Sequence, residues 1–253
     1  MRVREACDSD QDLRGVLMRP IGFSTGALAY ADFREALRMM EGKQLQAVEL
    51  SALRLAELVP LLEAIPALDL SGFRHVSIHA PSQYDANGEA ALWQLIAGEA
   101  GRGWPIVMHP DALVNFGLWR ELGASVCIEN MDKRKPVGRS ARELAAIFAE
   151  LPDATFCFDI GHARQVDPTM TEAWLILREF GSKLRQVHVS EVNTRSKHDR
   201  LSWASMFAFQ DVAHLIPENV PLILETPAPE ADMDAEIAKA REALPVGRKT
   251  MAA

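Results

Sequence analysis

The chain has 253 residues, of which 48% are hydrophobic and 25% charged, and this composition is typical of a globular protein and excludes a disordered one. Its formal net charge of −8 at pH 7 disfavours non-specific coating of nucleic acid, although the mouth of a site can carry the opposite sign locally. Its longest apolar stretches are shorter than the roughly 18 residues of a membrane span, so we expect no membrane contact.

The start of the chain and its cysteines indicate a cytoplasmic protein. The opening MRVREACDSDQD lacks the apolar core of a signal peptide. Cys7, Cys127 and Cys157 are odd in number and share no C-x-x-C spacing, which argues against a disulfide framework and against a thiolate zinc site. We therefore expect reduced thiols and a cytoplasmic location.

Short β-rich runs alternate with helical patterns along most of the chain. They predict eight strands, at IGFS (21–24), AVEL (47–50), RHVSIH (74–79), PIVMH (105–109), SVCIE (125–129), TFCFD (155–159), RQVHV (185–189) and PLILE (221–225). The intervening helical patterns include ADFREALRMMEG, which ends at Gly42, then LRLAELVPLLEAI, and SARELAAIFAEL, in which Ser140 and Glu143 fit a capping box.

This alternation predicts a single-domain α/β protein, a parallel sheet closed into a (β/α)8 TIM barrel. An open doubly wound sheet is the alternative, but GFSTG after the first strand lacks the spacing of a dinucleotide-binding loop. We expect the barrel at residues 20–245, after an N-terminal extension at 1–19 and before a C-terminal tail at 246–253.

Six consecutive predicted strands end in residue types that ligate metals. These residues are His79, His109, Glu129, Asp159 with His162 three positions on, His188 and Glu225. In such a barrel the carboxyl ends of the strands meet at one mouth. The residues two positions earlier share the inward face, and we expect them to fill the interior without a second charged ring; they are Ser77, Val107, Cys127, Cys157, Gln186 and Ile223.

Carboxylates that converge on one mouth repel one another unless a cation compensates them. Mixed histidine and carboxylate ligands suit zinc or manganese best, with cobalt, iron or magnesium as alternatives, and we expect one to three ions. A single strand-end Asp or His is more often a loop hydrogen-bonder or a helix cap, but four of the seven histidines fall at the mouth. His75 and His214 are expected to be structural, and Glu49 to hydrogen-bond within the core or behind a ligand.

These strand ends resemble those of the xylose isomerase-like TIM barrels, a superfamily that also contains endonuclease IV. The resemblance covers roughly residues 20–230 and rests on the motifs SIHAPS, VMHPD, IENM, FDIGHA, VHVSEV and ILETP. It implies that the metal ligands shared by isomerases, epimerases and nucleases of the group are here Glu129, Asp159, His188 and Glu225.

The resemblance also implies further metal positions like those of endonuclease IV. His79 and His109 match one of them, with Glu129 as a bridge. The other uses His162 and a D-x-H pair, for which this chain has His198 but Ser196 in place of the aspartate, and Asp199 is the candidate substitute.

Two basic loops are predicted at the mouth. MDKRKPVGR contains Lys133, Arg134, Lys135 and Arg139, and TRSKHDR contains Arg195, Lys197 and Arg200, with Arg164 nearby. A solvated charge run is one interpretation. The other is an anionic small-molecule substrate such as a sugar phosphate or sugar acid, or a phosphodiester, bound by Lys133, Arg164, Arg195, Lys197 and Arg200.

Three functions remain open. The first is a metal-dependent isomerase or epimerase, or a related lyase, in which Glu129 or Glu225 removes the proton next to a carbonyl and returns it elsewhere, the metal stabilises the enediolate and His162 donates to a substrate hydroxyl. The second is a zinc-dependent phosphoester hydrolase like endonuclease IV, the one hypothesis with nucleic acid as a partner. The third is a non-catalytic metal-binding barrel.

Trp203 and Phe207, in SWASMFAFQ, are expected to pack within a helix layer. A contact in a homo-oligomer or a lid over the mouth are the alternatives.

Overall fold

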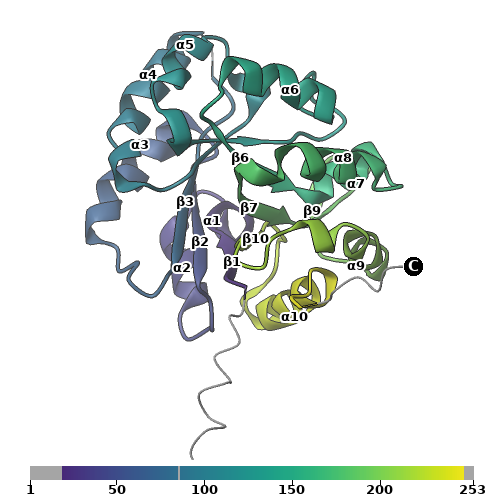
Figure 1. The fold of residues 1–253 in the computed structure, drawn as a ribbon. Coiled ribbons are helices and arrows are strands. Elements are labelled where there is room, and N and C mark those ends of the chain that lie inside the picture. Colours follow the sequence, from purple (N-terminus) through teal and green to yellow (C-terminus); the bar gives the residue numbers. More distant parts are fainter. Residues whose placement is uncertain (1–18, 85, 248–253) are drawn as a thin grey trace, which may run out of the picture.

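The protein is a closed barrel of parallel strands surrounded by helices (Figure 1), which confirms the predicted fold. The computed structural model describes residues 19–84 and 86–247. The predicted extension and tail lie largely outside these residues, as does Cys7, so the division of the chain at 19 and 246 stays a prediction. Arg19 is already tied to the barrel, because its buried guanidinium donates to the Leu244 and Ile216 carbonyl oxygens at 3.1 and 3.0 Å.

The barrel strands are neighbours in the order β1-β10-β7-β6-β5-β4-β3-β2. They are β1 (Ile21–Ser24), β2 (Ala47–Ser51), β3 (His75–His79), β4 (Ile106–Met108), β5 (Val126–Glu129), β6 (Thr155–Asp159), β7 (Leu184–Val189) and β10 (Leu222–Leu224). A small antiparallel hairpin, β8 (Glu191–Val192) and β9 (His198–Asp199), lies in the connection after β7. Because β4 and β10 are shorter than predicted, His109 and Glu225 come directly after their strands.

Helices follow the strands around the barrel (Figure 1). They are α1 (Thr25–Ala29), α2 (Phe33–Met40), α3 (Leu55–Ala64), α4 (Ala86–Ala97), α5 (Phe116–Arg120), α6 (Ala141–Glu150), α7 (Ile160–Val166), α8 (Thr171–Phe180), α9 (Trp203–Gln210) and α10 (Met233–Ala243). In the described part of the chain, no helix combines the length and apolar character that crossing a bilayer requires.

Only half of the predicted capping box of α6 forms. The Ser140 hydroxyl accepts from the Glu143 N–H at 3.2 Å, as expected of a helix cap. The Glu143 carboxylate, however, accepts from the Arg139 N–H at 2.8 Å and pairs with the Arg139 guanidinium, instead of reaching the Ser140 N–H.

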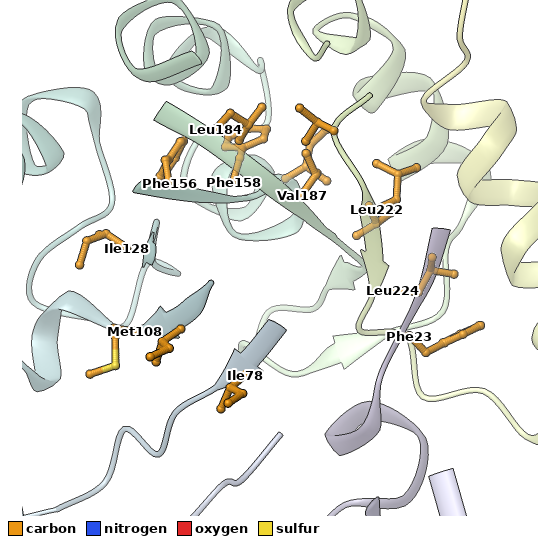
Figure 2. Close-up of a cluster of buried hydrophobic side chains, with 14 of the residues drawn as sticks. Phe23, Ile78, Met108, Ile128, Phe156, Phe158, Leu184, Val187, Leu222 and Leu224 are labelled. Carbon is orange, nitrogen blue, oxygen red and sulfur yellow. The ribbon is translucent and has the colours of Figure 1, made fainter. Parts of the chain in front are cut away.

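The outward faces of the strands build the main hydrophobic core. Side chains such as Phe23, Ile78, Ile128, Phe156 and Val187 are completely buried between the barrel and the helices (Figure 2). A strand buried on both faces is the expected result when helices cover a parallel sheet.

The six residues expected to fill the barrel interior are all completely buried, and none is charged. On the β4–β6 side the interior holds the apolar group Val107, Cys127 and Cys157, whose two thiols are free. On the other side Glu49, from β2, is fully buried. The expectation that no second charged ring lies below the mouth is therefore confirmed, because Glu49 is a single carboxylate, and it makes the hydrogen bonds within the core that were expected of it.

The expectation that Trp203 and Phe207 pack within a helix layer is wrong. Their residues are 65% and 62% exposed, and their rings lie on one side of α9 with centroids 6.2 Å apart. One turn of helix separates the two residues, so they form an apolar surface pair next to the connection that contains the β8–β9 hairpin.

Closure of the barrel between β1 and β2 depends on Gly22. A Cβ at this position would lie 1.6 Å from the Ala47 carbonyl oxygen, which is backbone and cannot rotate away. We expect Gly22→Ala to lower the free energy of unfolding by about 3 kcal/mol or more, the upper end of overpacking costs. Gly72→Ala, where a Cβ meets nothing within 4 Å, is the control and should change it by less than about 0.5 kcal/mol. Chemical denaturation of both variants measures the difference; equal stabilities would contradict this account.

Candidate metal centre

Four side chains from neighbouring strand ends converge at the mouth of the barrel. Glu129, Asp159 and His188 belong to β5, β6 and β7, and Glu225 directly follows β10. One ligand atom of each lies within 4.8 Å of the others. His188 Nδ1 is 3.3 Å from Glu129 Oε1 and 3.5 Å from Glu225 Oε2. We call these four residues the central cluster.

Two histidines extend this cluster toward β3 and β4. His79 Nε2 and His109 Nε2 lie 3.3 and 3.2 Å from Glu129 Oε2, so the two nitrogens converge on one oxygen. Their rings meet edge to face, with centroids 5.1 Å apart. His79, His109 and Glu129 thus form a second group of suitable ligand atoms, and Glu129 belongs to both groups.

Asp159 belongs to the central cluster and to a third group with His162 and His198. Its Oδ1 accepts from the His162 N–H at 2.6 Å and so caps α7, which starts at the next residue. The intervening Gly161 is required, because a Cβ there would lie 2.5 Å from the Ser190 carbonyl oxygen. The D-x-x-H spacing therefore serves the helix cap and the cluster at the same time.

The third group lacks the acidic residue that the resemblance implied. Ser196 occupies a left-handed turn with a φ of 52°, and its hydroxyl bonds the Gln165 side chain. Asp199 does not replace the missing carboxylate. Its side chain is exposed and accepts from Asn193 Nδ2 at 2.8 Å, outside every ligand group among the described residues. The expectation that Asp199 substitutes is wrong, because alternation on β9 directs it away from His198.

Asn130 is a site residue that the sequence patterns did not single out. Its side-chain amide donates to the Asp159 carbonyl oxygen and accepts from the Asp159 N–H, both at 2.8 Å. Its own carbonyl oxygen lies 3.0 Å from His162 Nδ1, which therefore carries the proton and donates. Asn130 thus holds Asp159 and His162 in place, and its one sequence signal is a polar residue directly after the strand that ends in Glu129.

Two of the three carboxylates of the central cluster lie where their charge is disfavoured, whereas the neighbouring histidines outweigh burial and hold the pKa of Glu129 well below its usual value. Burial, reinforced by the charge of Glu129, raises the pKa of Glu225 to about 8 and the pKa of Asp159 to about 7. Burial opposes the charged form of His79, but hydrogen bonding and attraction to Glu129 and Glu49 raise its pKa to about 9. The site therefore holds protons that a bound cation would displace.

The donor set fits a divalent cation. Asp159 Oδ2 is buried in the cluster and has no hydrogen-bond partner, which is costly unless an ion occupies the space beside it. Glu129, Asp159, His188 and Glu225 would hold one ion, and His79 and His109 would hold a second with Glu129. The third group offers only three ligands, among them the shared Asp159.

The basic residues expected at the mouth divide into two sets. Several are engaged in ion pairs: Arg200 with Asp232 and Glu236, Arg164 with Glu191, Lys135 with Asp111, and Arg139 with Glu143. Arg134 pairs with Asp132 and also donates to the Ser196 carbonyl oxygen at 3.0 Å, which joins the loops after β5 and β7. Lys133, Arg195 and Lys197 are exposed, and no ion pair in the described part of the chain involves them.

Ion binding at the central cluster predicts a measurable stabilisation. Zinc or manganese at 100 times its dissociation constant should add about 2.7 kcal/mol and raise the melting temperature by roughly 5–10 °C. Asp159→Asn keeps a capping oxygen but removes a charge, so we expect it to lose most of this shift. Asp199→Asn is the exposed control and should keep it. Thermal unfolding with and without a chelator measures the effect; an equal shift in Asp159→Asn would refute the ligand assignment.

Comparisons with known proteins agree with this architecture. No protein-family model matches the chain, and neither does any curated protein sequence. Among solved structures, a protein from Anabaena variabilis, provisionally assigned as a sugar phosphate isomerase/epimerase, is 12% identical with a TM-score of 0.55, and the match covers 91% of this chain and 89% of that one. SacUVDE is 14% identical with a TM-score of 0.53, over 89% of this chain and 99% of its own. At identities this low, these similarities show only a shared fold. That fold is the TIM barrel implied by the resemblance to the xylose isomerase-like superfamily.

Proposed function

We propose that this chain is a divalent-metal-dependent isomerase or epimerase, or a related lyase, that acts on a small anionic sugar or polyol. The observation that carries this proposal is the central cluster, in which two carboxylates flank one imidazole. Glu129 and Glu225 come from the outer strands of a four-strand arc, and His188 Nδ1 lies 3.3 and 3.5 Å from them.

Proton transfer next to a carbonyl needs a side chain that accepts the proton from one carbon and can donate it again at another. The Glu225 side chain is 13% exposed toward the mouth, whereas that of Glu129 is 1% exposed. Glu225 would therefore take the proton from the carbon and return the same proton at the neighbouring carbon, while Glu129 would stay ionised beside the cation. A bound divalent ion would supply positive charge to the substrate oxygens as negative charge develops there.

The rim of the site supports a small anionic substrate. His162 and His198 lie beside the central cluster. Because His162 Nδ1 donates to the Asn130 carbonyl oxygen, its Nε2 would accept from a substrate hydroxyl, and an N–H of the His198 ring would donate to one. The unpaired cations Lys133, Arg195 and Lys197 lie in the loops after β5 and β7. Helices α1 and α7 start directly after β1 and β6, so these connections leave no insertion that could grip a polymer. The likeness to a sugar phosphate isomerase/epimerase supports the same substrate class.

Phosphoester hydrolysis of the endonuclease IV type is the second candidate. It is favoured by the second ligand group, because His79 and His109 add a cation position that proton transfer does not need. Ser196 in place of an acidic residue and the short connections weigh against it. A barrel that binds metal without catalysis is the third candidate, which intact ligands at four strand ends disfavour.

Hydrogen exchange distinguishes these candidates. We expect the manganese-loaded or zinc-loaded protein to exchange a carbon-bound hydrogen of an aldose or ketose phosphate with D2O, as followed by NMR. Glu225→Gln should slow this exchange at least about 100-fold, a typical loss for a general base, while Asp199→Asn leaves it unchanged.

The other outcomes identify the alternatives. Cleavage of abasic-site DNA without carbon exchange would contradict the isomerase proposal in favour of hydrolysis. Stoichiometric metal binding with neither reaction across a panel of sugar phosphates would favour the non-catalytic barrel.

The exposed cations provide a test of the substrate's charge. Replacing Arg195 and Lys197 by alanine should raise KM for a phosphorylated sugar about tenfold, since each removes a charge-assisted hydrogen bond or its electrostatic equivalent. The KM for the unphosphorylated sugar should not change. Arg142→Ala, on the outside of α6, is the matched control. Equal effects on both sugars would show that these side chains do not contact the anionic group.

A further inference from the structure

Glu49 lies directly below the central cluster and reaches across the barrel. It is on β2, whereas its main partner, His188, is on β7, and these strands are not neighbours in the barrel. Its carboxylate is fully buried. Glu49 Oε2 lies 2.9 Å from His188 Nε2, 2.6 Å from Gln186 Nε2 and 3.2 Å from Ser77 Oγ.

This contact decides which nitrogen of His188 faces the mouth. If His188 Nε2 carried no proton, its lone pair would point at a buried carboxylate oxygen 2.9 Å away, and two acceptors would repel each other in a dry interior. The proton therefore belongs on Nε2, where it donates to Glu49. The opposite nitrogen, Nδ1, faces Glu129 and Glu225, where a bound cation would take the place of a proton on it.

The Gln186 amide is consistent with this arrangement. Its oxygen lies 2.9 Å from His75 Nε2, which fixes the amide so that its NH2 group faces Glu49. Gln186 Nε2 is also 2.9 Å from His188 Nε2. Both nitrogens donate to Glu49, so neither accepts a hydrogen bond from the other. Both supporting residues are on β3. Ser77 donates to the Glu49 carboxylate directly, and His75 orients the Gln186 amide that donates to it.

Glu49 could instead be a ligand itself, because its carboxylate and His79, His188 and Glu225 also form a group within 4.8 Å. Its Oε1 is buried and has no hydrogen-bond partner. Its Oε2, however, already accepts from three side chains, and the His188 ring separates that oxygen from Glu129. The hydrogen bonds therefore favour support of a ligand over ligation.

We infer that Glu49 is a positioning residue, which fixes His188 with the proton on Nε2 and aims Nδ1 at the cation position of the central cluster. This inference rests on the proposed metal centre. Partners of this kind raise the basicity of a ligating imidazole and lock its orientation, and their loss commonly weakens metal binding 10–100-fold.

Metal affinity and the state of the His188 ring test this role. We expect Glu49→Gln to weaken binding of the first Zn²⁺ or Co²⁺ about 10–100-fold in competition with a chromophoric chelator. In the zinc-loaded wild type, ¹⁵N spectra of the histidine rings should show His188 protonated on Nε2 and bound through Nδ1, and Glu49→Gln should disturb that pattern. Glu49→Asp keeps the charge, so it should restore part of the affinity.

Glu236→Gln is the matched control, because Glu236 is an equally buried glutamate that accepts from Arg200, Lys239 and the Leu201 N–H on the α9–α10 side. Its variant should lose stability without losing metal affinity. Wild-type affinity and ring protonation in Glu49→Gln would overturn the role of Glu49 while leaving the metal centre intact. A wild-type chain that takes up neither ion would overturn the metal centre, and the role of Glu49 with it.

Discussion

The mutual repulsion of buried carboxylates at one end of a closed barrel is the constraint on which this structure depends. Closure brings the ends of β5, β6 and β7 and the residue after β10 together, so Glu129, Asp159 and Glu225 cannot avoid one another. The interleaved histidines relieve part of this repulsion, but they leave two carboxyl groups with raised pKa values and one buried oxygen without a partner. A divalent cation would relieve the remainder, so the fold and the donor chemistry indicate the same kind of ligand.

Sharing of ligands follows from the order of strands around the barrel. Glu129 lies between the histidines of β3 and β4 on one side and the β6–β7 ligands on the other, so it belongs to two groups. Asp159 links the central cluster to His162 and His198 because it also begins α7. Any change at either carboxylate therefore acts on two candidate cation positions, and the chemistry of the site rests on these two residues more than on any histidine.

Support for the site comes from below and from the side. Asn130 joins β5 to β6 through both backbone groups of Asp159, and Glu49 joins β2 to β7 through His188. A fully buried carboxylate is costly unless it is hydrogen-bonded, and Glu49 meets this condition at Oε2, which accepts from three donors, but not at Oε1, which has no partner. The polar half of the interior thus belongs to the site, while Val107, Cys127 and Cys157 pack as ordinary core.

The sequence by itself determined the barrel and the residues at its mouth. Strand and helix periods are local signals, and eight alternations allow few architectures, so the ends of the strands could be located to within a residue or two. Only the tertiary structure decided that Asp199 turns away, that Trp203 and Phe207 are exposed, and that Glu49 contacts a histidine 139 residues away. Those outcomes depend on hairpin register and on which strands face each other across the closed barrel, and neither is encoded in the spacing of residues along the chain.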